Sequence, residues 1–397
     1  MTITFLPRND TSSFYPIFFC VKLLLTFRIL FFLSKTSYRL VWSVTIGSFW
    51  FQEEFIRYYG YKAETHDVTT EDGYILQVHR IVKEGGPPVI FQHGLLGASD
   101  SWVLRGPKSD LSFMLADEGY DIWLPDCRGN MYSQRHVNLT TADAAFWDFS
   151  WHEMGYYDMP AVVDHILNVT GYKNLVYLGH SMGTTMFYVF ASTRPEYNEK
   201  IALSFSLAPI AFVSHMSLGG TTKPLANNAR NIAVRRDFSL FTSLFTKSTC
   251  VYTETFPLFA SHFPSGTSAK TLQHFAQSLL SGDFRMFSYG KTKNLEVYGT
   301  EFAPQYNLSL ITSPVSLHYS SNDFLSHPAD VNILASKLPN LIGKFKVPFK
   351  NFNHVDYLWA RDDFRCIFVY YLTLIFCNRL AEGLKNNFQT WFILTAA

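Results

Sequence analysis

The alternation of apolar and polar positions along the chain predicts a β-hairpin followed by a series of short buried strands. Two alternating runs within residues 65–82 flank Glu71-Asp72-Gly73, and an Asp-Gly pair supplies the positive φ angles that a tight hairpin needs. Beyond the hairpin, short apolar runs predict buried strands at 89–91, 120–124, 175–178, 314–319 and 345–349.

Segments with helical spacing separate these strands. Apolar positions recur every three or four residues at 111–118, 159–169, 182–191 and 330–338. In the second of these helices we expect one buried face that consists of Ala161, Val162, His165, Ile166 and Val169. Strands that alternate with helices predict an α/β fold, with a mostly parallel sheet and helices on both of its faces.

The regular alternation stops between about 206 and 310, where Phe, Ser, Thr and Gly dominate, and it resumes with the strand at 314–319. This interruption predicts an inserted cap or lid domain at 206–310. The core is then divided into a first part at 52–205 and a second part at 311–365.

The two ends of the chain do not fit the core pattern. Lys22 and Arg28 interrupt the apolar run at 14–33, and a cation near the centre of a membrane helix costs about 2.5–3.5 kcal/mol. Residues 1–51 therefore make a poor spanning helix, and a signal, a signal anchor and a membrane-proximal anchor all stay open for them. The apolar runs of the tail at 366–397 are too short to cross a bilayer, and we assign them no chemistry.

Composition and charge exclude several classes of function. The chain of 397 residues has a net charge of +1, so no basic surface is available for nucleic acid. Hydrophobic residues make up 48% of the chain and charged residues 16%, which excludes disorder for most of its length. The five cysteines form no Cys-x-x-Cys pair, and neither a phosphate-binding glycine loop nor a His-Glu-x-x-His helix occurs. We expect no metal and no other cofactor, and we interpret Cys127 as a buried small side chain rather than a nucleophile.

The strongest chemical signal is Gly179-His180-Ser181-Met182-Gly183, which lies between a predicted strand and a predicted helix. In this context Gly-x-Ser-x-Gly is typical of a nucleophile elbow, a strained turn that exposes the serine hydroxyl at the carboxyl edge of the sheet. Gly179 and Gly183 avoid the clashes that larger side chains would make at these positions. We predict that Ser181 is a catalytic nucleophile.

Two later residues have the order and position of partners for Ser181. A serine hydroxyl needs a base to take its proton, and in folds with this elbow the acid precedes the histidine. Asp323 and His354 follow the strands at 314–319 and 345–349, so the carboxyl edge of the sheet would bring both beside Ser181. Asp330 is the alternative acid, but its place at the start of a helix favours a capping role.

The negative charge that develops on an attacked carbonyl needs two backbone N–H donors. The first is expected from Met182, the residue after the nucleophile. The second is expected from the loop His93-Gly94-Leu95-Leu96-Gly97, which follows the strand at 89–91, and we select Leu95 as the donor.

An ordered series of motifs extends from Glu53 to Arg361: Tyr59-Gly60-Tyr61, Thr70-Glu71-Asp72-Gly73-Tyr74-Ile75-Leu76, His93-Gly94-Leu95-Leu96, Gly119-Tyr120-Asp121-Ile122-Trp123, Arg128-Gly129-Asn130, Phe146-Trp147-Asp148-Phe149-Ser150, Tyr306-Asn307-Leu308 and Asn353-His354-Val355-Asp356-Tyr357. In these motifs the chain resembles the acid lipases, which include gastric lipase, lysosomal acid lipase and insect relatives. The resemblance implies an α/β-hydrolase core with a cap, and hydrolysis of triacylglycerols or sterol esters. It also implies Ser181 as nucleophile, Asp323 as acid, His354 as base, and the amides of Leu95 and Met182 as oxyanion donors.

Two positions depart from the family pattern. The family usually has Gln after the nucleophile, where this chain has Met182. The gastric members carry a disulfide in the cap, whereas the predicted cap of this chain contains only Cys250. Neither departure involves Ser181, Asp323 or His354.

We therefore expect a serine ester hydrolase that acts on neutral lipid at a lipid–water interface. Sequons at Asn9, Asn138, Asn168 and Asn307 favour, weakly, a glycoprotein of the secretory pathway, either secreted or lysosomal. The segment at 1–51 is the candidate for membrane association. Two alternatives stay open: a non-catalytic lipid-binding or membrane-anchored protein on the same fold, and a short-chain esterase.

Overall fold

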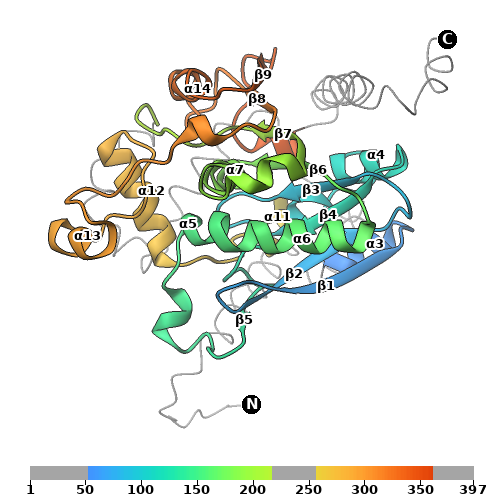
Figure 1. Ribbon diagram of the computed structural model, residues 1–397. Coiled ribbons are helices and arrows are strands. Elements are labelled where there is room, and N and C mark those ends of the chain that lie inside the picture. Colours follow the sequence, from blue (N-terminus) through green and yellow to red (C-terminus); the bar gives the residue numbers. More distant parts are fainter. Residues whose placement is uncertain (1–51, 217–255, 361–397) are drawn as a thin grey trace, which may run out of the picture.

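The computed structural model describes residues 52–216 and 256–360, and Figure 1 shows their arrangement. The segments predicted at 1–51 and 366–397 lie outside the described residues, as does Cys250. Within the described part, nine strands form one sheet in the order β1-β2-β4-β3-β6-β7-β8-β9, and β5 pairs with β2. The strands are β1 (Ala63–Thr69), β2 (Tyr74–Ile81), β3 (Pro88–Gln92), β4 (Asp121–Pro125), β5 (Arg135–His136), β6 (Leu175–His180), β7 (Ile201–Leu207), β8 (Val315–Tyr319) and β9 (Leu341–Lys346).

The mostly parallel sheet that the sequence predicts is present. Strands β4, β3, β6, β7, β8 and β9 run parallel, and the β1–β2 hairpin adds antiparallel strands beside β4. In the hairpin turn, only Gly73 of the Asp-Gly pair has a positive φ angle, of 96°. Residues 70–73 separate β1 from β2, so the turn is longer than the tight two-residue turn that the pair predicts. Strand β7 continues to Leu207, so the first two residues of the predicted insertion belong to the sheet.

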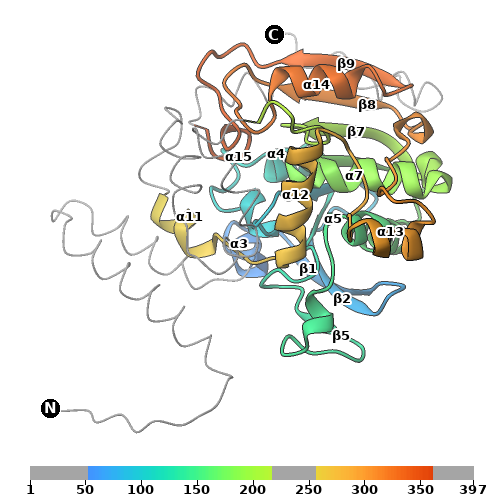
Figure 2. The same cartoon turned by 90° about the vertical axis from the view of Figure 1, so that its left-hand side faces the viewer.

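Helices cover both faces of the sheet, as Figures 1 and 2 show. Those of the core are α3 (Gln52–Tyr58), α4 (Leu111–Asp117), α5 (Trp151–Glu153), α6 (Met159–Thr170), α7 (Met182–Thr193), α14 (Pro328–Ala335) and α15 (Asp356–Trp359). A π-helical segment (Met154–Asp158) joins α5 to α6. Short 3-10 turns lie at 99–102, 144–147, 195–200 and 308–310. The region after residue 255 adds α11 (Phe256–His262), α12 (Ala269–Ser281) and α13 (Lys291–Tyr298).

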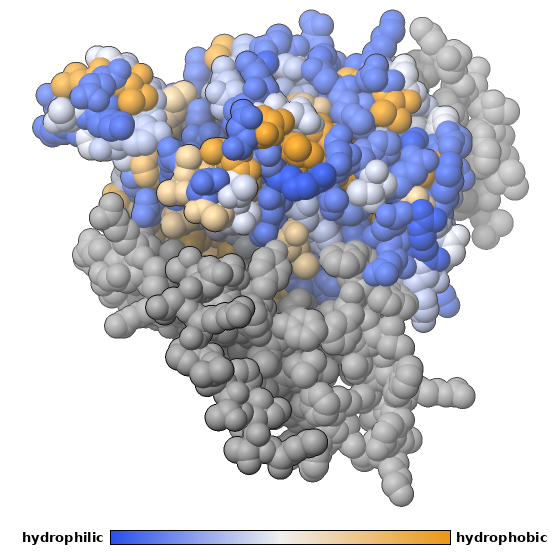
Figure 3. All heavy atoms as spheres, turned by 90° about the horizontal axis from the view of Figure 1, so that it is seen from below, coloured by the Kyte–Doolittle hydropathy of each residue, from blue (hydrophilic) through white to orange (hydrophobic). Residues whose placement is uncertain are grey.

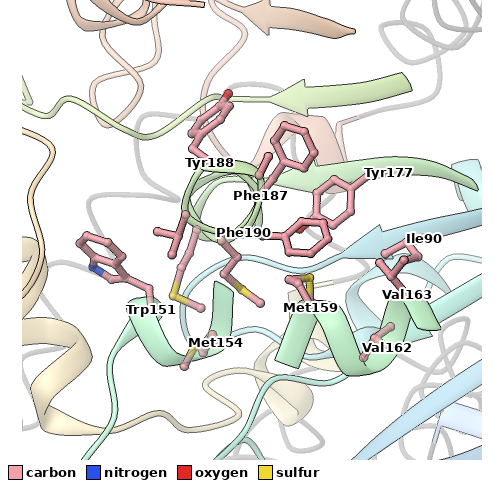
Figure 4. Close-up of a cluster of buried hydrophobic side chains, with 14 of the residues drawn as sticks. Ile90, Trp151, Met154, Met159, Val162, Val163, Tyr177, Phe187, Tyr188 and Phe190 are labelled. Atoms are coloured by element: carbon pink, nitrogen blue, oxygen red, sulfur yellow. The ribbon is translucent and has the colours of Figure 1, made fainter. Parts of the chain in front are cut away.

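Alternate side chains of each central strand enter two separate apolar cores. Ile90 and Tyr177 face the core beneath α6 and α7, while Val89 and Leu178 face the core on the side of α3 and α4. This alternation follows from the two-residue repeat of a strand, and it explains why buried parallel strands have continuous apolar runs. Figure 4 shows the first core, in which aromatic side chains of α7 pack above Met154, Met159, Val162 and Val163.

The buried face of the predicted helix at 159–169 differs from the structure. In α6 the buried residues are Met159, Pro160, Val162, Val163 and Ile166, whereas Val169 is 40% exposed. The predicted face was wrong at Val169, which lies in the last turn of α6, just before Gly171 terminates the helix in a left-handed conformation.

The final strand was placed too late in the sequence. Strand β9 spans Leu341–Lys346 rather than 345–349. It lies at the edge of the sheet and is only half-buried, so its apolar signal is weak. The stronger apolar residues that follow, Val347 and Phe349, pack against the core beyond the end of the strand.

Seen from below, the described part of the surface is mainly polar, with a group of apolar residues near its centre (Figure 3). Among the described residues, no helix is both long enough and apolar enough to span a membrane.

Candidate active site

Ser181 lies in a strained turn between β6 and α7. Its backbone has φ 55° and ψ −120°, a combination that a non-glycine residue adopts at an energetic cost of about 1–3 kcal/mol. The Ser181 N–H donates to the carbonyl oxygen of Leu207 at 3.0 Å, and the Thr184 hydroxyl donates to the Ser181 carbonyl at 2.7 Å. These bonds hold the turn, which has the geometry of the predicted nucleophile elbow.

The two elbow glycines leave room for close backbone approaches. A Cβ atom on Gly179 would lie 2.9 Å from the carbonyl carbon and oxygen of Gly183. A Cβ atom on Gly183 would lie 2.6 Å from the carbonyl oxygen of Gln92, at the end of β3. Because no ordinary Cβ contact is this short, both positions require glycine.

The structure brings Ser181, His354 and Asp323 together in one hydrogen-bonded chain. The His354 Nε2 lies 2.7 Å from the Ser181 Oγ, and its Nδ1 lies 2.9 and 3.1 Å from the two carboxylate oxygens of Asp323. Asp323 and His354 are buried, with 1% and 4% exposure, whereas Ser181 is half-buried. A carboxylate can only accept, so Nδ1 carries the proton and Nε2 is free to accept from the serine hydroxyl.

The surroundings of Asp323 keep its carboxyl group ionised. Burial would raise its pKa, but the nearby His354 and the backbone N–H groups of Ser326 and Leu325 outweigh this effect and lower it. The Ser326 and Leu325 amides donate to one carboxylate oxygen at 2.8 and 2.9 Å. The Asp323 side chain is therefore anchored by its own loop as well as by His354.

The loops of Asp323 and His354 are also bonded to each other. The Ser320 hydroxyl donates to the carbonyl oxygen of Phe352 at 2.5 Å, and the Asn322 amide donates to that of Asn351 at 2.9 Å. Asp356 accepts from the Asn353 N–H at 2.6 Å, which supports the His354 loop. These bonds fix the two side chains although 31 residues separate them along the chain.

Asp330, the alternative acid, is bonded elsewhere. Its carboxylate accepts from the backbone N–H of His215 at 2.9 Å and contacts His215 Nδ1 at 2.7 Å. The interpretation of Asp330 as a helix cap was wrong, because His327 is the N-cap of α14 and accepts from the Ala329 N–H. Asp330 lies in the first turn of α14, where its negative charge interacts favourably with the helix N-terminus.

The loop after β3 approaches the elbow closely. A Cβ atom on Gly94 would lie 3.0 Å from the Ser181 Cβ, which is tighter than most Cβ contacts, so glycine favours this close approach. The neighbouring Leu96 has a positive φ angle of 59°, and the Gly97 N–H donates to the Gly94 carbonyl at 3.1 Å. This tight turn carries Leu95. Met182 is the first residue of α7, so its N–H belongs to the first turn, where a helix has no internal acceptor.

A buried polar network supports this loop, and the sequence interpretation missed it. The His93 ring bonds the Gly94 carbonyl through Nδ1 at 2.9 Å and accepts from the Cys127 N–H through Nε2 at 3.2 Å. Burial lowers the pKa of His93 to about 4 and raises that of the adjacent Asp126 to about 7. The only sequence signal was that His93 and Asp126 follow neighbouring strands.

The other predicted positions, Cys127 and the glycosylation candidates, lie apart from the hydrogen-bonded chain of Ser181, His354 and Asp323 in their contacts. Cys127 is buried, and burial raises the pKa of its thiol well above the usual value, as expected for a structural side chain. Asn138, Asn168 and Asn307 are all exposed. Within residues 52–216 and 256–360, no three His, Cys, Asp or Glu side chains are grouped so that they could hold a metal ion.

Comparison with known proteins gives consistent matches. A family model described as a partial alpha/beta-hydrolase lipase region matches residues 52–106, and one described as alpha/beta hydrolase fold matches residues 87–360. Lipase 1 of Drosophila melanogaster is 42% identical over 78% of this chain and 76% of its own length. Gastric triacylglycerol lipase of Bos taurus is 38% identical over 78% of this chain and 87% of its own.

The solved structures support the same fold. The esterase from Exiguobacterium antarcticum superposes with a TM-score of 0.53, at 14% identity, over 79% of this chain and 99% of its own. At that identity the similarity concerns the fold alone.

Proposed function

The chain belongs to the acid-lipase family of α/β-hydrolases and is an ester-hydrolysing enzyme of the lipase type, and from this premise we propose that it cleaves neutral lipids through Ser181, His354 and Asp323. The observation that carries the proposal is the continuous hydrogen-bonded chain from the Ser181 Oγ to the Asp323 carboxylate.

The first half of the proposed reaction forms an acyl-enzyme. The His354 Nε2 takes the hydroxyl proton as the Ser181 Oγ attacks the ester carbonyl carbon. Asp323 holds the tautomer of His354 that leaves Nε2 unprotonated, and it stabilises the charged ring that forms. His354 then gives this proton to the departing alcohol, and the acyl group stays on the Ser181 Oγ.

The second half returns the enzyme to its starting state. Water replaces the alcohol, and His354 Nε2 takes one of its protons as the oxygen attacks the acyl carbon. The bond to the Ser181 Oγ breaks, Oγ regains the proton, and the fatty acid leaves. In both halves the N–H groups of Leu95 and Met182 would bind the oxyanion, and losing one such donor typically costs about 10²–10³ in rate.

The support for a neutral-lipid substrate comes from the relatives. The bovine relative is named a triacylglycerol lipase, and the Drosophila melanogaster relative is named Lipase 1. We propose triacylglycerols or sterol esters at a lipid–water interface as the substrate, and residues 206–310 as the cap. The family and the exposed sequons at Asn138, Asn168 and Asn307 favour a glycoprotein of the secretory pathway.

A fluorophosphonate probe tests the proposed nucleophile. The full chain should become labelled at Ser181, and Ser181→Ala should abolish labelling and lower ester turnover by something on the order of 10⁶. A control is Ser192→Ala, which removes a hydroxyl from the other end of α7, where it donates to the Tyr188 carbonyl at 2.6 Å. If wild type is not labelled at Ser181, the chain is a non-catalytic lipid-binding protein.

A series of esters of increasing acyl length tests the substrate. A lipase should have a kcat/KM that rises from short to medium or long chains and should act on emulsified triacylglycerol. Highest turnover on acetate or propionate esters, with none on the emulsion, would identify a short-chain esterase instead.

A further inference from the structure

His180 occupies the junction between the nucleophile and the base. It is the last residue of β6, directly before Ser181, and it is 4% exposed. Its Nε2 lies 2.9 Å from the backbone carbonyl oxygen of His354. A carbonyl oxygen can only accept, so the Nε2 of His180 carries a proton and donates it to this bond. The strand of the nucleophile is thereby bonded to the main chain of the base.

The other edge of the His180 ring faces the loop that carries Leu95. A Cβ atom on Gly94 would lie 3.2 Å from the His180 Nδ1. This Nδ1 is buried and has no hydrogen-bond partner among the described residues. Burial, together with the nearby His354, lowers the pKa of His180 to about 3. The ring is therefore neutral, and it keeps the tautomer that bonds the His354 carbonyl.

The loop of His354 follows β9, a half-buried strand at the edge of the sheet. Because this strand is covered on few sides, hydrogen bonds from other loops are needed to fix the position of His354. Ser320, Asn322 and Asp356 bond the residues just before His354. His180 bonds the carbonyl of His354 itself, from the side of the nucleophile. The ring centroids of His180 and His354 are 5.0 Å apart.

We propose that His180 is a positioning residue of the hydrolytic site: its Nε2–H fixes the backbone of His354 and so holds the His354 Nε2 at bonding distance from the Ser181 Oγ. This inference rests on the proposed function, since it assigns a role relative to the proposed base. The turn geometry of the elbow requires no particular side chain at residue 180, whereas the proposed role requires a hydrogen-bond donor there.

Three substitutions separate positioning from simple packing. In His180→Gln the amide nitrogen can reach close to the place of Nε2, so the donor is kept without a titrating ring. In His180→Asn the amide nitrogen lies at the place of Nδ1. The asparagine side chain is therefore too short to donate to the His354 carbonyl. His180→Leu removes the donor and keeps much of the volume. The matched control is His318→Gln in β8, outside the proposed cap, where an equally buried ring stacks on Phe345 and bonds Ser316.

The measurements are the rate of fluorophosphonate labelling, kcat and KM on a soluble short-chain ester, and the melting temperature. Displacement of the base by about 1 Å lowers the rate by something on the order of a hundredfold. We expect His180→Asn and His180→Leu to lose about tenfold to a hundredfold in kcat and in labelling rate, with KM nearly unchanged. His180→Gln should restore most of this loss, and His318→Gln should melt earlier without a comparable loss in kcat.

Two results would overturn the assignment: a kcat for His180→Asn and His180→Leu within about twofold of wild type, or a His180→Gln variant that is folded yet as slow as His180→Asn. If His180→Leu does not fold, the Gln and Asn variants decide. A wild-type chain that is not labelled at Ser181 refutes the proposed function. Labelled wild type with equally fast His180 variants refutes only the positioning role.

Discussion

The hydroxyl of Ser320 donates a hydrogen bond of 2.5 Å to the backbone carbonyl oxygen of Phe352, two residues before His354. Ser320 is fully buried and lies three residues before Asp323. This bond joins the loop of the proposed acid to the loop of the proposed base. The separation of the two functional groups is thus fixed by the main chain as well as by their own contact.

Ser320→Ala should weaken both stability and catalysis. The substitution leaves the buried Phe352 carbonyl without this donor, which costs about 1–3 kcal/mol. We expect the free energy of unfolding in urea to fall by that amount and kcat on a soluble ester to fall several-fold. Ser336→Ala is the control, because Ser336 makes the same kind of bond to the Ile333 carbonyl at the surface. Equal effects of the two substitutions would show that the bond between the loops has no special role.

Gly183→Ala should disturb the site through the end of β3. The added Cβ would lie 2.6 Å from the Gln92 carbonyl oxygen and 3.0 Å from that of His93, so β3 and the following loop must shift. Such overpacking typically costs about 1–3 kcal/mol, and we expect the labelling rate of Ser181 to fall by about 10².

The control for this prediction is Gly119→Ala. A Cβ at Gly119 meets nothing within 4 Å, although its φ angle of 96° is unfavourable for alanine. This variant should lose about 1–3 kcal/mol of stability from backbone strain while its folded fraction labels at the normal rate. Normal labelling of folded Gly183→Ala would contradict the close approach that we describe.

The sequence predicted the central part of the fold well because its strands are buried on both faces. The runs at 89–91 and 175–178 are apolar at every position, and each coincides with a strand of the sheet. The pattern failed where burial is partial, as in β9 and at the end of α6. In β9, pairing with β8 rather than local hydropathy decides which residues form the strand. In α6, contact with the rest of the fold decides which apolar residues are buried.

Of the candidate site, the sequence indicated only the three side chains that form the hydrogen-bonded chain. Ser181, Asp323 and His354 could be selected because each follows a strand and because the elbow motif sets their order. The contacts of His180 and His93 could not, since a histidine carries no sequence signal for the carbonyl that it bonds. Such partners are set by how separate loops meet in space.

Arg128→Leu should destabilise the protein strongly. The Arg128 guanidinium is 1% exposed, bonds Asp72 at 2.6 and 2.8 Å and Asp158 at 2.6 and 2.8 Å, and lies 4.0 Å from the Tyr74 ring centroid. Its loss leaves two carboxylates without their cation, which costs about 3–5 kcal/mol. Urea unfolding measures this change.

The surface pair of Arg135 and Asp67 provides the comparison for Arg128. Their side chains are 48% and 52% exposed, so Arg135→Leu should cost at most about 1 kcal/mol. Similar losses for Arg128→Leu and Arg135→Leu would mean that the buried cluster contributes no more than a surface ion pair.

His318 should make the stability depend on pH. Burial lowers its pKa from 6.5 to about 3, so between these values the unfolded chain binds a proton that the folded chain does not. The stability due to neutral His318 is complete above about pH 6.5 and is lost as pH falls towards 3, by about 1.4 kcal/mol per pH unit for one proton.

His318→Phe isolates this contribution from the packing effect. At pH 7.5 His318 is neutral in both the folded and the unfolded chain. The difference in free energy of unfolding between variant and wild type at this pH therefore measures the change in packing and the loss of the bond to Ser316. Between pH 6 and 4 the variant should lose stability less steeply than wild type. If the two curves stay parallel over this range, His318 does not take part in the acid response.

His262 connects the predicted cap to the core next to the proposed oxyanion loop. Its Nδ1 lies 2.8 Å from the buried Asp100 carboxylate, and the Ser265 N–H donates to the Leu96 carbonyl at 2.8 Å. His262→Phe keeps a ring against Phe55 but removes the bond to Asp100. We expect a loss of about 1–3 kcal/mol and faster amide hydrogen exchange in residues 258–265, measured by mass spectrometry.

A control for this prediction is Ser261→Ala, in which the lost hydroxyl bonds only within α11, to the Leu258 carbonyl at 2.6 Å. It should change exchange less than His262→Phe, because the contact with the core remains. The hydrogen exchange of residues 94–97 shows whether the loss of the His262 bond is felt only in α11 or also in the oxyanion loop. We expect it to rise in His262→Phe as well, because the Leu96 carbonyl accepts a hydrogen bond from Ser265 in the same segment. Unchanged exchange at both sites would show that the bond between His262 and Asp100 does not hold α11 to the core.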